Sequence, residues 1–553
     1  MAKIDRKFRK NPRIIYNDDS CSVRMVPPPH TVEKIYTAVD HLKDTQVDIL
    51  CFCVATMLPE SYPSKIIDNF YGTQGPASYL HAKKDRHYFP LEKDLIYGLL
   101  KKGIDYLPLL IKRTQEHGIR FFASFRMNDI HHRSNPSGRL SPAFWREHQS
   151  YRLWSVTDAY NYYSAALDYS HPEVRQQYFS MVEEVAGRYD VDGIELDFCR
   201  EPYLFQPGEG WGKRHIMAGF IRSIRQMLDK TGKRKGKKIS LLVRTVFDPE
   251  RLKETGMDIR DWLENGYLDI LVMAGHANPT ANDNNVLLEP WLGLCRKHGV
   301  LFYPSVELAM KSNGENKRAL ISNPRLPKHN AGYKYSSREE FLRLLRATAQ
   351  NYFGQGAEGI YLFNHPCSLY EGETVRFTNK EKFQFFLSYL KQLGSRETLK
   401  GTEKLYLFLP ELPICVESQR PPEFHQTIKF NIFDPVVKDR DAKVVLRFRQ
   451  VAEKNPHAYG KYRQDPIVPK GWVEGYLNGV CIEEKDIERK VQPKGRTPSG
   501  YLLRKHQLVT ITLSANRLKF GKNLMAFHIP RFPEARDPYV YIYELTVNIG
   551  EKA

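Results

Sequence analysis

The sequence is 553 residues long and has no apolar run longer than a single strand. A transmembrane helix needs about 20 consecutive apolar residues, so we expect no membrane span. The N-terminal segment MAKIDRKFRK is basic, and no apolar stretch follows it, so no signal peptide is visible. The sequence therefore predicts a cytoplasmic location, or a periplasmic or secreted one if a signal has been removed.

Cysteine is scarce, with 8 residues in the chain, and no two of them form a CxxC pair. This spacing excludes a disulfide scaffold and provides no zinc site. Several cysteines lie within apolar, strand-like runs, which predicts buried free thiols in a reducing compartment. There is no HExxH or His-x-His spacing either, so we expect neither a metal nor another cofactor.

The sequence has fewer acidic than basic residues, with 64 Asp and Glu against 83 Lys and Arg, and its formal net charge is +19. A positive surface attracts anions, and both nucleic acids and acidic glycans are anionic. The densest basic run, KTGKRKGKK at 230–238, is predicted to be an exposed loop between a helix and a strand. The sequence contains no zinc finger, RRM signature or P-loop, so nucleic acid is not an expected partner.

Apolar runs rich in β-branched residues alternate with amphipathic stretches through the first 395 residues, a pattern typical of parallel strands buried on both faces. Eight strands are predicted at 13–19, 47–54, 119–126, 193–197, 239–244, 269–274, 301–306 and 359–364. Helices are predicted at 31–42, 107–117, 172–189, 213–228, 285–298 and 338–353, with C-caps at Gly118, Gly299 and Gly354. Eight β-α units favour an α/β fold, a (β/α)8 TIM barrel over residues 1–395. A doubly wound sheet is the rival, but no GxGxxG follows the first strand.

The pattern changes near Gly394, after which helical periodicity almost disappears. Short alternating strands separated by turn residues are predicted at 404–409, 427–431, 442–448, 472–477, 508–513, 523–528 and 539–547. They predict a jelly-roll-like β-sandwich at 396–553. Such a module can brace the barrel, form a homodimer or bind sugar, and the sequence leaves these three roles open.

Polar residues gather at the predicted C-terminal ends of the barrel strands, where TIM barrels place their catalytic groups. They are Asn17, Asp18, Asp19, Arg126, Asn128, Asp129, His131, His132, Glu195, Asp197, Arg200, Arg244, His276, Asn278, Glu307, Asn364 and His365. Carboxylates and imidazoles supply the proton donor and the base that glycosidic cleavage needs. Arginine forks bind carboxylate or sulfate in a bidentate manner. The set predicts an enzyme that acts on an acidic glycan.

Glu195 and Asp197 alternate with apolar residues, so both side chains face the interior of the predicted barrel. Buried carboxylates need partners, and Arg126 and Arg244 are the candidates. A direct role in catalysis and a structural role both stay open for this pair. Asp192 lies at the opposite end of the same strand and is predicted to be a turn or cap residue.

The string YDVDGIELDF at 189–198 resembles strand four of barrels in the wider family-10-like glycosidase group, and LDYSHPEVR at 167–175 fits the same group. More narrowly, SFRMNDIH at 124–131 is similar to the active-site strand of glycoside hydrolase family 156. That family consists of inverting exo-sialidases on a (β/α)8 barrel with β-sandwich additions. The resemblance spans roughly residues 10–395 and, loosely, the C-terminal part. It implies an exo-sialidase that releases terminal sialic acid from sialoglycans.

In that family a histidine is the Brønsted acid and an aspartate on strand one is the Brønsted base. The resemblance implies His131 as the acid, with His132 as the alternative, and Asp19 as the base, with Asp18 as the alternative. The substrate-binding residues that it implies, or that lie on the same rim, are Arg126, Arg200, Asn364, Asp18, Asn128, Glu195, Asp197, Arg244, His132 and His276.

The chemistry agrees with this assignment. A sialoside carries its carboxylate on the anomeric carbon, so a carboxylate nucleophile would be repelled there, whereas a histidine donor avoids part of that repulsion. An aspartate that holds a water suits single displacement with inversion. Two other hypotheses stay open. One is a glycosidase acting on another acidic or neutral glycan through Glu195 or Asp197, and the other is a non-catalytic glycan-binding protein.

Overall fold

The structure is a computed structural model, and it describes residues 9–23, 26, 28–55, 62–66, 94–130, 142–153, 165–199, 202–275, 281–307, 309–310, 338–365, 370–371, 374–375, 380–410, 414–417, 426–454, 464–465, 467–496, 502–503, 505–530 and 538–550. The chain forms two compact units. The first comprises Met1–Thr280, Leu288–Leu308 and Ala357–Gly394, and the second comprises Ala281–Leu287, Ala309–Gly356 and Ser395–Ala553. Segments 281–287 and 309–356, which precede the predicted sandwich in the sequence, thus belong to the second unit.

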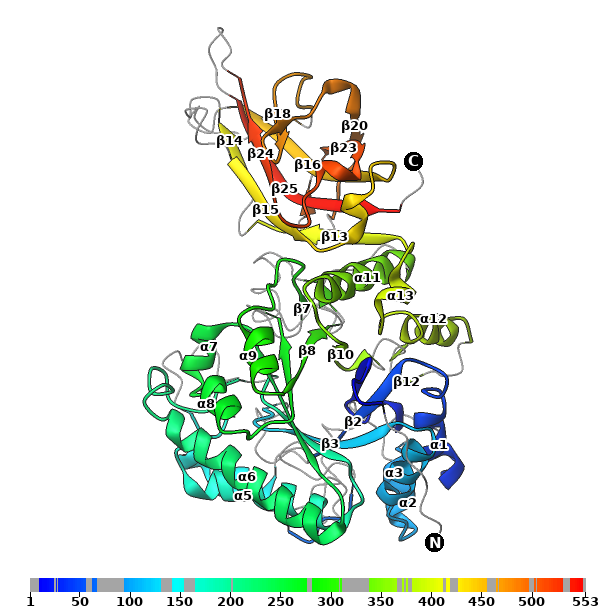
Figure 1. Ribbon diagram of the computed structural model, residues 1–553, viewed down its shortest axis with the longest axis vertical. Coiled ribbons are helices and arrows are strands. Elements are labelled where there is room, and N and C mark those ends of the chain that lie inside the picture. Colours follow the sequence, from blue (N-terminus) through cyan, green and yellow to red (C-terminus); the bar gives the residue numbers. More distant parts are fainter. Residues whose placement is uncertain are drawn as a thin grey trace. The chain divides into compact units, whose positions relative to one another are not determined.

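The first unit contains a closed barrel of eight parallel strands in the order β1-β10-β8-β6-β5-β4-β3-β2 (Figure 1). Its strands are β1 (Ile14–Asp18), β2 (Val47–Ala55), β3 (Arg120–Arg126), β4 (Gly193–Asp197), β5 (Ser240–Val246), β6 (Ile270–Ala274), β8 (Leu301–Val306) and β10 (Ile360–Leu362). Each lies within two residues of a predicted strand at both ends. The predicted TIM barrel is confirmed, and the doubly wound sheet is wrong because the sheet closes on itself.

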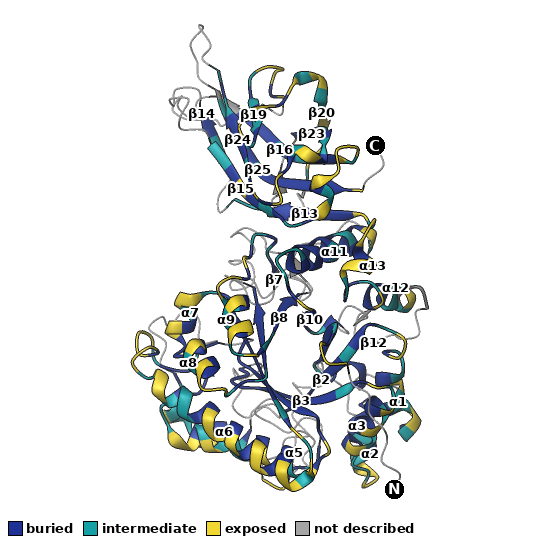
Figure 2. Cartoon of the chain, viewed as in Figure 1, coloured by how far each residue is buried: buried dark blue, intermediate teal, exposed yellow. Residues whose placement is uncertain are grey.

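Helices connect successive barrel strands and bury their outer face. In the first unit these are α1 (Val32–Asp40), α2 (Leu95–Lys101), α3 (Leu107–Glu116), α4 (Ala143–Glu147), α5 (Pro172–Arg188), α6 (Arg214–Lys235), α7 (Pro249–Glu254), α8 (Ile259–Glu264), α9 (Trp291–Lys297) and α12 (Lys380–Leu390). Figure 2 shows exposed residues concentrated on helices such as α5 and α6, whereas the barrel strands are almost entirely buried. Burial on both faces explains why the strands are apolar throughout.

Alternate residues of the strands fill the barrel interior. A single apolar cluster joins Ile15, Ile49, Cys51, Phe122, Leu242, Ile270, Val272, Tyr303, Tyr361 and Phe363. This alternation also sets which polar residues point inward farther along each strand. Cys51, Cys53, Cys199 and Cys295 are buried and outside any disulfide in the described part of the chain, as predicted, while Cys481 is exposed.

Two of the three predicted glycine C-caps are confirmed. Gly118 and Gly299 adopt φ of +74° and +69°, the left-handed conformation that ends a helix. Gly354 is instead the last residue of α11 (Arg338–Gly354), and Gly356 takes the positive φ. A Cβ at residue 354 would clash with the carbonyl oxygen of Phe433, so glycine is needed there for close approach.

The predicted exposed loop at 230–238 is wrong, because α6 continues to Lys235 and ends at Gly236 in a left-handed cap. Lys235 donates its Nζ to the carbonyl oxygens of Ala186 and Tyr189, at 2.7 and 2.6 Å, where α5 ends. A cation is favourable beside these unpaired carbonyls. Lys235 of the basic run therefore links the C-terminal end of α6 to the C-terminal end of α5. The predicted helix at 285–298 is also too long, since α9 begins only after Pro290.

The second unit contains two antiparallel sheets, in agreement with the predicted C-terminal sheet domain. One has the order β13-β25-β16-β23-β20, with β14 paired to β25 and β17 to β16, and the other has the order β15-β24-β18-β19. The strands are β13 (Lys404–Phe408), β14 (Ile414–Glu417), β15 (Gln426–Ile432), β16 (Lys443–Lys454), β17 (Gln464–Asp465), β18 (Glu474–Leu477), β19 (Val480–Cys481), β20 (Ile487–Gln492), β23 (His506–Ser514), β24 (Gly521–His528) and β25 (Pro538–Ile549). Residues from both sheets share one core.

The second unit also contains the long helix α11 and the short helix α13 (Arg396–Leu399). Its remaining strand pairs are β7 (Ala281–Asn282) with β9 (Ala309–Met310) and β21 (Gly495–Arg496) with β22 (Leu502–Leu503), and the first unit also contains the pair β11 (Tyr370–Glu371) and β12 (Thr374–Val375). Helix α11 packs on β13, where Leu344 lies with Leu405 and Leu407. Among the described residues, no helix has the length and apolar character to cross a membrane.

Candidate active site

Two residues at the C-terminal ends of neighbouring strands have left-handed backbone conformations. Ser20 follows β1 with φ +63°, and Asn364 follows β10 with φ +54°. These two strands pair in the barrel. Residues other than glycine seldom adopt this conformation, and such strained positions cluster at functional sites. The Ser20 hydroxyl donates to the carbonyl oxygen of Cys53 at 2.7 Å, which fixes the turn after β1.

Arg126, the last residue of β3, lies between two carboxylates at this rim. Its Nη2 donates to Asp19 Oδ2, and its Nη1 donates to Asp129 Oδ2 at 2.8 Å. Burial alone would lower the pKa of Arg126, but the Asp19 and Asp129 carboxylates raise it well above its ordinary value. The Asp19 side chain is 9% exposed, so this carboxylate reaches the surface of the rim.

Asp18 faces away from Arg126. It is buried, and its carboxylate accepts hydrogen bonds from the Ser22 hydroxyl and, at 3.4 Å, from the Ser22 backbone N–H. Asn17 points into the barrel, where its side chain contacts Glu195, so alternation along β1 directs Asp18 to the other face. The structure therefore brings Asp19, and not Asp18, to the arginine.

A second arginine lies between two carboxylates deeper in the barrel. Arg244 on β5 donates Nη1 to both Asp197 oxygens, at 3.0 and 3.1 Å, and Nη2 to Glu307 Oε1 at 2.9 Å. All three side chains are about 1% exposed. The Ser305 hydroxyl also donates to Glu307, at 2.5 Å. The expected pairing of Asp197 with Arg244 is therefore present.

The strand register connects the two arginines. In the strand register, Asp197 lies opposite Arg126 of β3 on one side and opposite Arg244 of β5 on the other. Burial would lower the pKa of Arg244, but Asp197, Cys199 and Glu307 raise it well above the ordinary value. Each guanidinium thus has two carboxylates of the chain as partners. Both arginines are predicted to bind substrate, and that role stays a prediction.

Glu195 has no arginine partner among the residues that the structure describes. Its Oε1 accepts from the Tyr361 hydroxyl at 2.7 Å, and its Oε2 accepts from Asn17 Nδ2 at 3.3 Å. The residue is 0% exposed. Burial and the Asp197 charge raise the pKa of Glu195 to about 7, while hydrogen bonds from Ser124 and Tyr361 act in the opposite direction. Tyr361 was missed by the sequence analysis because it lies within an apolar run, although alternation along β10 places it inside.

Asn128 and Asp192 have structural partners. The Asn128 amide donates to the carbonyl oxygens of Leu167 and Tyr203, at 2.9 and 2.6 Å, and accepts from the Leu167 N–H at 2.9 Å. It therefore holds two loops of the rim together. Asp192 accepts hydrogen bonds from the Phe121 N–H and the Gln115 side chain, at 3.0 and 2.9 Å, which agrees with its predicted structural role.

Several predicted site residues lie outside the described residues, namely His131, His132, Arg200, His276 and Asn278. Asn364 is partly exposed at the end of β10. Buried polar atoms of the site without a hydrogen-bond partner within the described ranges include Asn17 Oδ1, Arg126 Nε and Arg244 Nε. The site thus keeps donors and an acceptor that a bound molecule or water can engage. No group of three His, Cys, Asp or Glu side chains among the residues described can hold a metal ion.

The Glu195 environment predicts a pH-dependent stability. The carboxyl pKa is about 7 in the folded chain and near 4.5 when unfolded, so between these values the folded state binds the extra proton. The free energy of unfolding therefore falls as pH rises through this window, by about 3 kcal/mol. Urea unfolding of the wild type and Glu195→Gln at pH 4.5 and pH 8 checks this. We expect the free energy of unfolding of the wild type, relative to that of Glu195→Gln, to be lower at pH 8 than at pH 4.5. An equal difference in the free energy of unfolding at both pH values would contradict this prediction.

Comparisons with known proteins support a glycoside-hydrolase-like barrel. A model of the family "Glycosyl hydrolase-like 10" matches residues 87–209, which include β3 and β4. This match supports the predicted family-10-like glycosidase group and does not confirm family 156. No curated protein matches the chain.

Solved structures that are similar include three glycosidases. A glycoside hydrolase family 18 N-acetylglucosaminidase from Paenibacillus barengoltzii is 12% identical, with 69% of this chain and 99% of that chain covered and a TM-score of 0.33. The GH36 α-galactosidase AgaA from Geobacillus stearothermophilus is 12% identical, covering 94% and 56%, with a TM-score of 0.32. A putative α-L-fucosidase from Bacteroides thetaiotaomicron is 8% identical, covering 96% and 95%, with a TM-score of 0.32. The fold and the family model together describe a glycoside-hydrolase-like TIM barrel whose residues 87–209 match the glycosyl hydrolase-like 10 family.

Proposed function

We propose that the chain is a glycoside hydrolase that releases terminal sialic acid from sialoglycans by single displacement with inversion. Asp19 is the base that activates water, and His131 is the acid that protonates the leaving oxygen. The observation that carries the proposal is the position of Asp19, which directly follows β1 at the rim and pairs with Arg126. The resemblance of 124–131 to the exo-sialidases supplies the substrate class.

Asp19 has the properties that a base in single displacement needs. Its carboxylate pairs with Arg126, and a carboxylate can accept a proton from water. Its remaining exposure leaves room for that water, whereas Asp197 and Glu307 are almost fully buried around Arg244. Inversion needs the base and the acid far enough apart to admit a water between the base and the anomeric carbon.

The arginine partners narrow the choice of residue for the substrate carboxylate. Arg244 is 1% exposed and bonded to two carboxylates, and Arg126 is bonded to two others. Binding a third carboxylate at either one would place like charges together. We therefore assign the substrate carboxylate to Arg200, which follows β4 in the sequence.

A second candidate function rests on Glu195, whose pKa of about 7 suits a general acid. In this case the enzyme cleaves another acidic or neutral glycan. The contacts disfavour it, because Glu195 is fully buried and both of its oxygens accept hydrogen bonds from the chain. A buried acid with these partners has to leave its network before it can reach a glycosidic oxygen.

Substrate turnover separates the two candidates. The purified chain is incubated with 2,3- and 2,6-linked sialyllactose, with a glucuronide and with neutral oligosaccharides, and the released sugars are quantified. We expect free sialic acid and lactose from at least one sialyllactose and no cleavage of the other substrates. Cleavage of the glucuronide or of a neutral glycan alone, abolished by Glu195→Gln, would establish the second candidate instead.

A further inference from the structure

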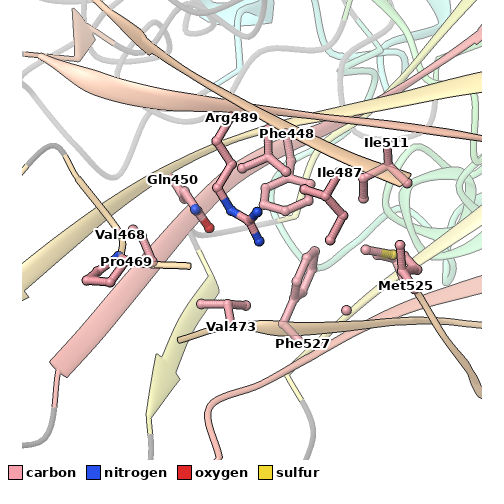
Figure 3. A pocket seen from close by; sticks show the side chains of 13 residues that line it. Phe448, Gln450, Val468, Pro469, Val473, Ile487, Arg489, Ile511, Met525 and Phe527 are labelled. Atoms are coloured by element: carbon pink, nitrogen blue, oxygen red, sulfur yellow. The ribbon is translucent and has the colours of Figure 1, made fainter. Parts of the chain in front are cut away.

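Buried polar atoms without a partner in the described part of the chain occur in both units. In the second unit, Gln450 and Arg489 carry two of them and line a pocket between the two sheets (Figure 3). The pocket has room for about one water, and Phe448 and Phe527 in its wall are 5% and 1% exposed, so it belongs to the packed core. In the first unit, Asn17 Oδ1 is such an atom, and it lies among the polar side chains of the candidate active site.

Two layers of polar side chains fill the barrel interior near the rim, and three strands contribute to both layers. The lower residue precedes the upper one by two positions each time, in the pairs Asn17 and Asp19, Ser124 and Arg126, and Glu195 and Asp197. The register agrees, because Ser124 lies opposite Glu195 and Arg126 lies opposite Asp197. Inward-facing residues of a strand are two positions apart, so the lower layer supports the upper one.

Glu195 joins three strands in the lower layer. It comes from β4, and its Oε1 accepts from the Tyr361 hydroxyl of β10 at 2.7 Å. Its Oε2 accepts from Asn17 Nδ2 of β1 at 3.3 Å. All three residues are at most 1% exposed, so these bonds form away from water, where hydrogen bonds are stronger. The Glu195 carboxyl group thus links the side chains of β1 and β10.

Backbone pairing between β1 and β10 ends just below this link. The last paired residues in the described register are Tyr16 and Leu362. Asn17 is the next residue of β1, and its side-chain contact with Glu195 continues the connection to β10 through Tyr361. The bridge therefore fixes the part of β1 that the backbone ladder with β10 does not reach.

Asp19 depends on this part of β1 for its position. The strand ends at Asp18, and Ser20 turns the chain with φ +63°, so Asp19 extends from the strand end toward Arg126. A reacting group that is displaced by about 1 Å can lose about a hundredfold in rate. The residues that hold the end of β1 therefore bear directly on the base.

We propose that Glu195 is a positioning residue for the base Asp19 and acts through the side chain of Asn17. Glu195 is 0% exposed and touches no substrate. The inference rests on the proposed function, in which Asp19 activates water. It differs from the second candidate function, in which Glu195 itself donates the proton.

Two substitutions of Glu195 separate its hydrogen bonds from its charge. Glu195→Gln keeps an oxygen that accepts from Tyr361 and gains an Nε2 that donates to Asn17 Oδ1 once the Asn17 amide has rotated. Glu195→Met has a similar volume and forms neither bond. Glu184→Met is the matched control, because Glu184 is also buried and accepts from a tyrosine, Tyr62, at 3.2 Å, but lies on α5 outside the barrel.

Kinetics on a chromogenic sialoside measure the effect in the full chain. We expect Glu195→Met to lower kcat about a hundredfold with KM within about threefold of the wild type, because the base moves while the substrate contacts stay. Glu195→Gln is expected to lose at most about fivefold in kcat, since its bridge survives. Glu184→Met is expected to keep the kcat of the wild type.

A double-mutant cycle shows whether Glu195 acts on Asp19. In the Asp19→Asn background, Glu195→Met is expected to lower the residual kcat by less than about threefold, because the base that it positions is already absent. A merely structural role would reduce kcat equally in both backgrounds. Melting temperatures verify folding, and Asn17→Leu, which breaks the same bridge from the other side, is the informative variant if Glu195→Met does not fold.

Three kinds of result overturn the inference. An unchanged kcat in Glu195→Met, or the same loss with and without Asp19, removes the positioning role and leaves Asp19 as the base. Equal inactivity of Glu195→Gln and Glu195→Met also removes it, because a proton donor is lost in both variants. Full activity of Asp19→Asn, or no cleavage by the wild type, overturns the proposed function and this inference together.

Discussion

Asp19→Asn is expected to lower kcat/KM on a sialoside about a hundredfold to ten-thousandfold, the usual contribution of a positioned base. The amide keeps the size of the side chain and can still contact Arg126, but it cannot take a proton from water. Asp18→Asn makes the same chemical change one residue away, on a side chain that points to Ser22 instead. We expect this second variant to retain activity within a few fold.

A chromogenic sialoside assay at several pH values measures both variants, with melting temperatures to verify folding. Full activity of Asp19→Asn, or an equal loss in Asp18→Asn, would show that the base has been assigned to the wrong carboxylate.

Arg244→Met is expected to lower the free energy of unfolding of the first unit by about 3–5 kcal/mol. The substitution leaves the Asp197 and Glu307 carboxylates buried and facing each other with no cation between them. Arg251→Met is the matched control. Arg251 pairs with Glu254 at 2.7 Å, but the two side chains are 38% and 61% exposed, so its loss costs at most about 1 kcal/mol.

Urea unfolding followed by tryptophan fluorescence reports mainly on this unit, because five of the six tryptophans belong to it. The triple variant Arg244→Met, Asp197→Asn, Glu307→Gln removes the unpaired charges together with the cation, and we expect it to recover part of the lost stability. If Arg244→Met lowers the free energy of unfolding no more than Arg251→Met does, the two buried ion pairs contribute far less to the stability of the barrel than their geometry implies.

The barrel was predictable from the sequence because its strands are buried on both faces. Runs such as 47–54 and 269–274 are almost purely apolar, and a parallel barrel covered by helices requires this pattern. The edge strand β20, with the sequence IERKVQ, was not predicted, because it is half exposed and mixes charges with apolar residues. Local pattern also failed at 230–238, where contacts of Lys235 with the end of α5 extend the helix.

The location of the site was predictable from the sequence, but most of the hydrogen-bond and ion-pair partners of its residues were not. The position of Asp197 and Arg244 at strand ends follows from the sequence, and their pairing was among the expected ones. The choice between Asp18 and Asp19 depends on which face of β1 each occupies, and two consecutive aspartates give no signal for that. Tyr361 and Asn17, the partners of Glu195, come from strands more than 160 residues distant in sequence, so only the closed barrel brings them together.

Proton NMR of sialyllactose hydrolysis, recorded from the first minutes, tests the central claim most directly. Single displacement at an α-sialoside releases the β-anomer of free sialic acid first, and the α-anomer then grows only by mutarotation. The account predicts this order. Early release of the α-anomer would mean retention, which requires a covalent intermediate or an equivalent double displacement, and it would contradict the assignment of Asp19 as a base that activates water.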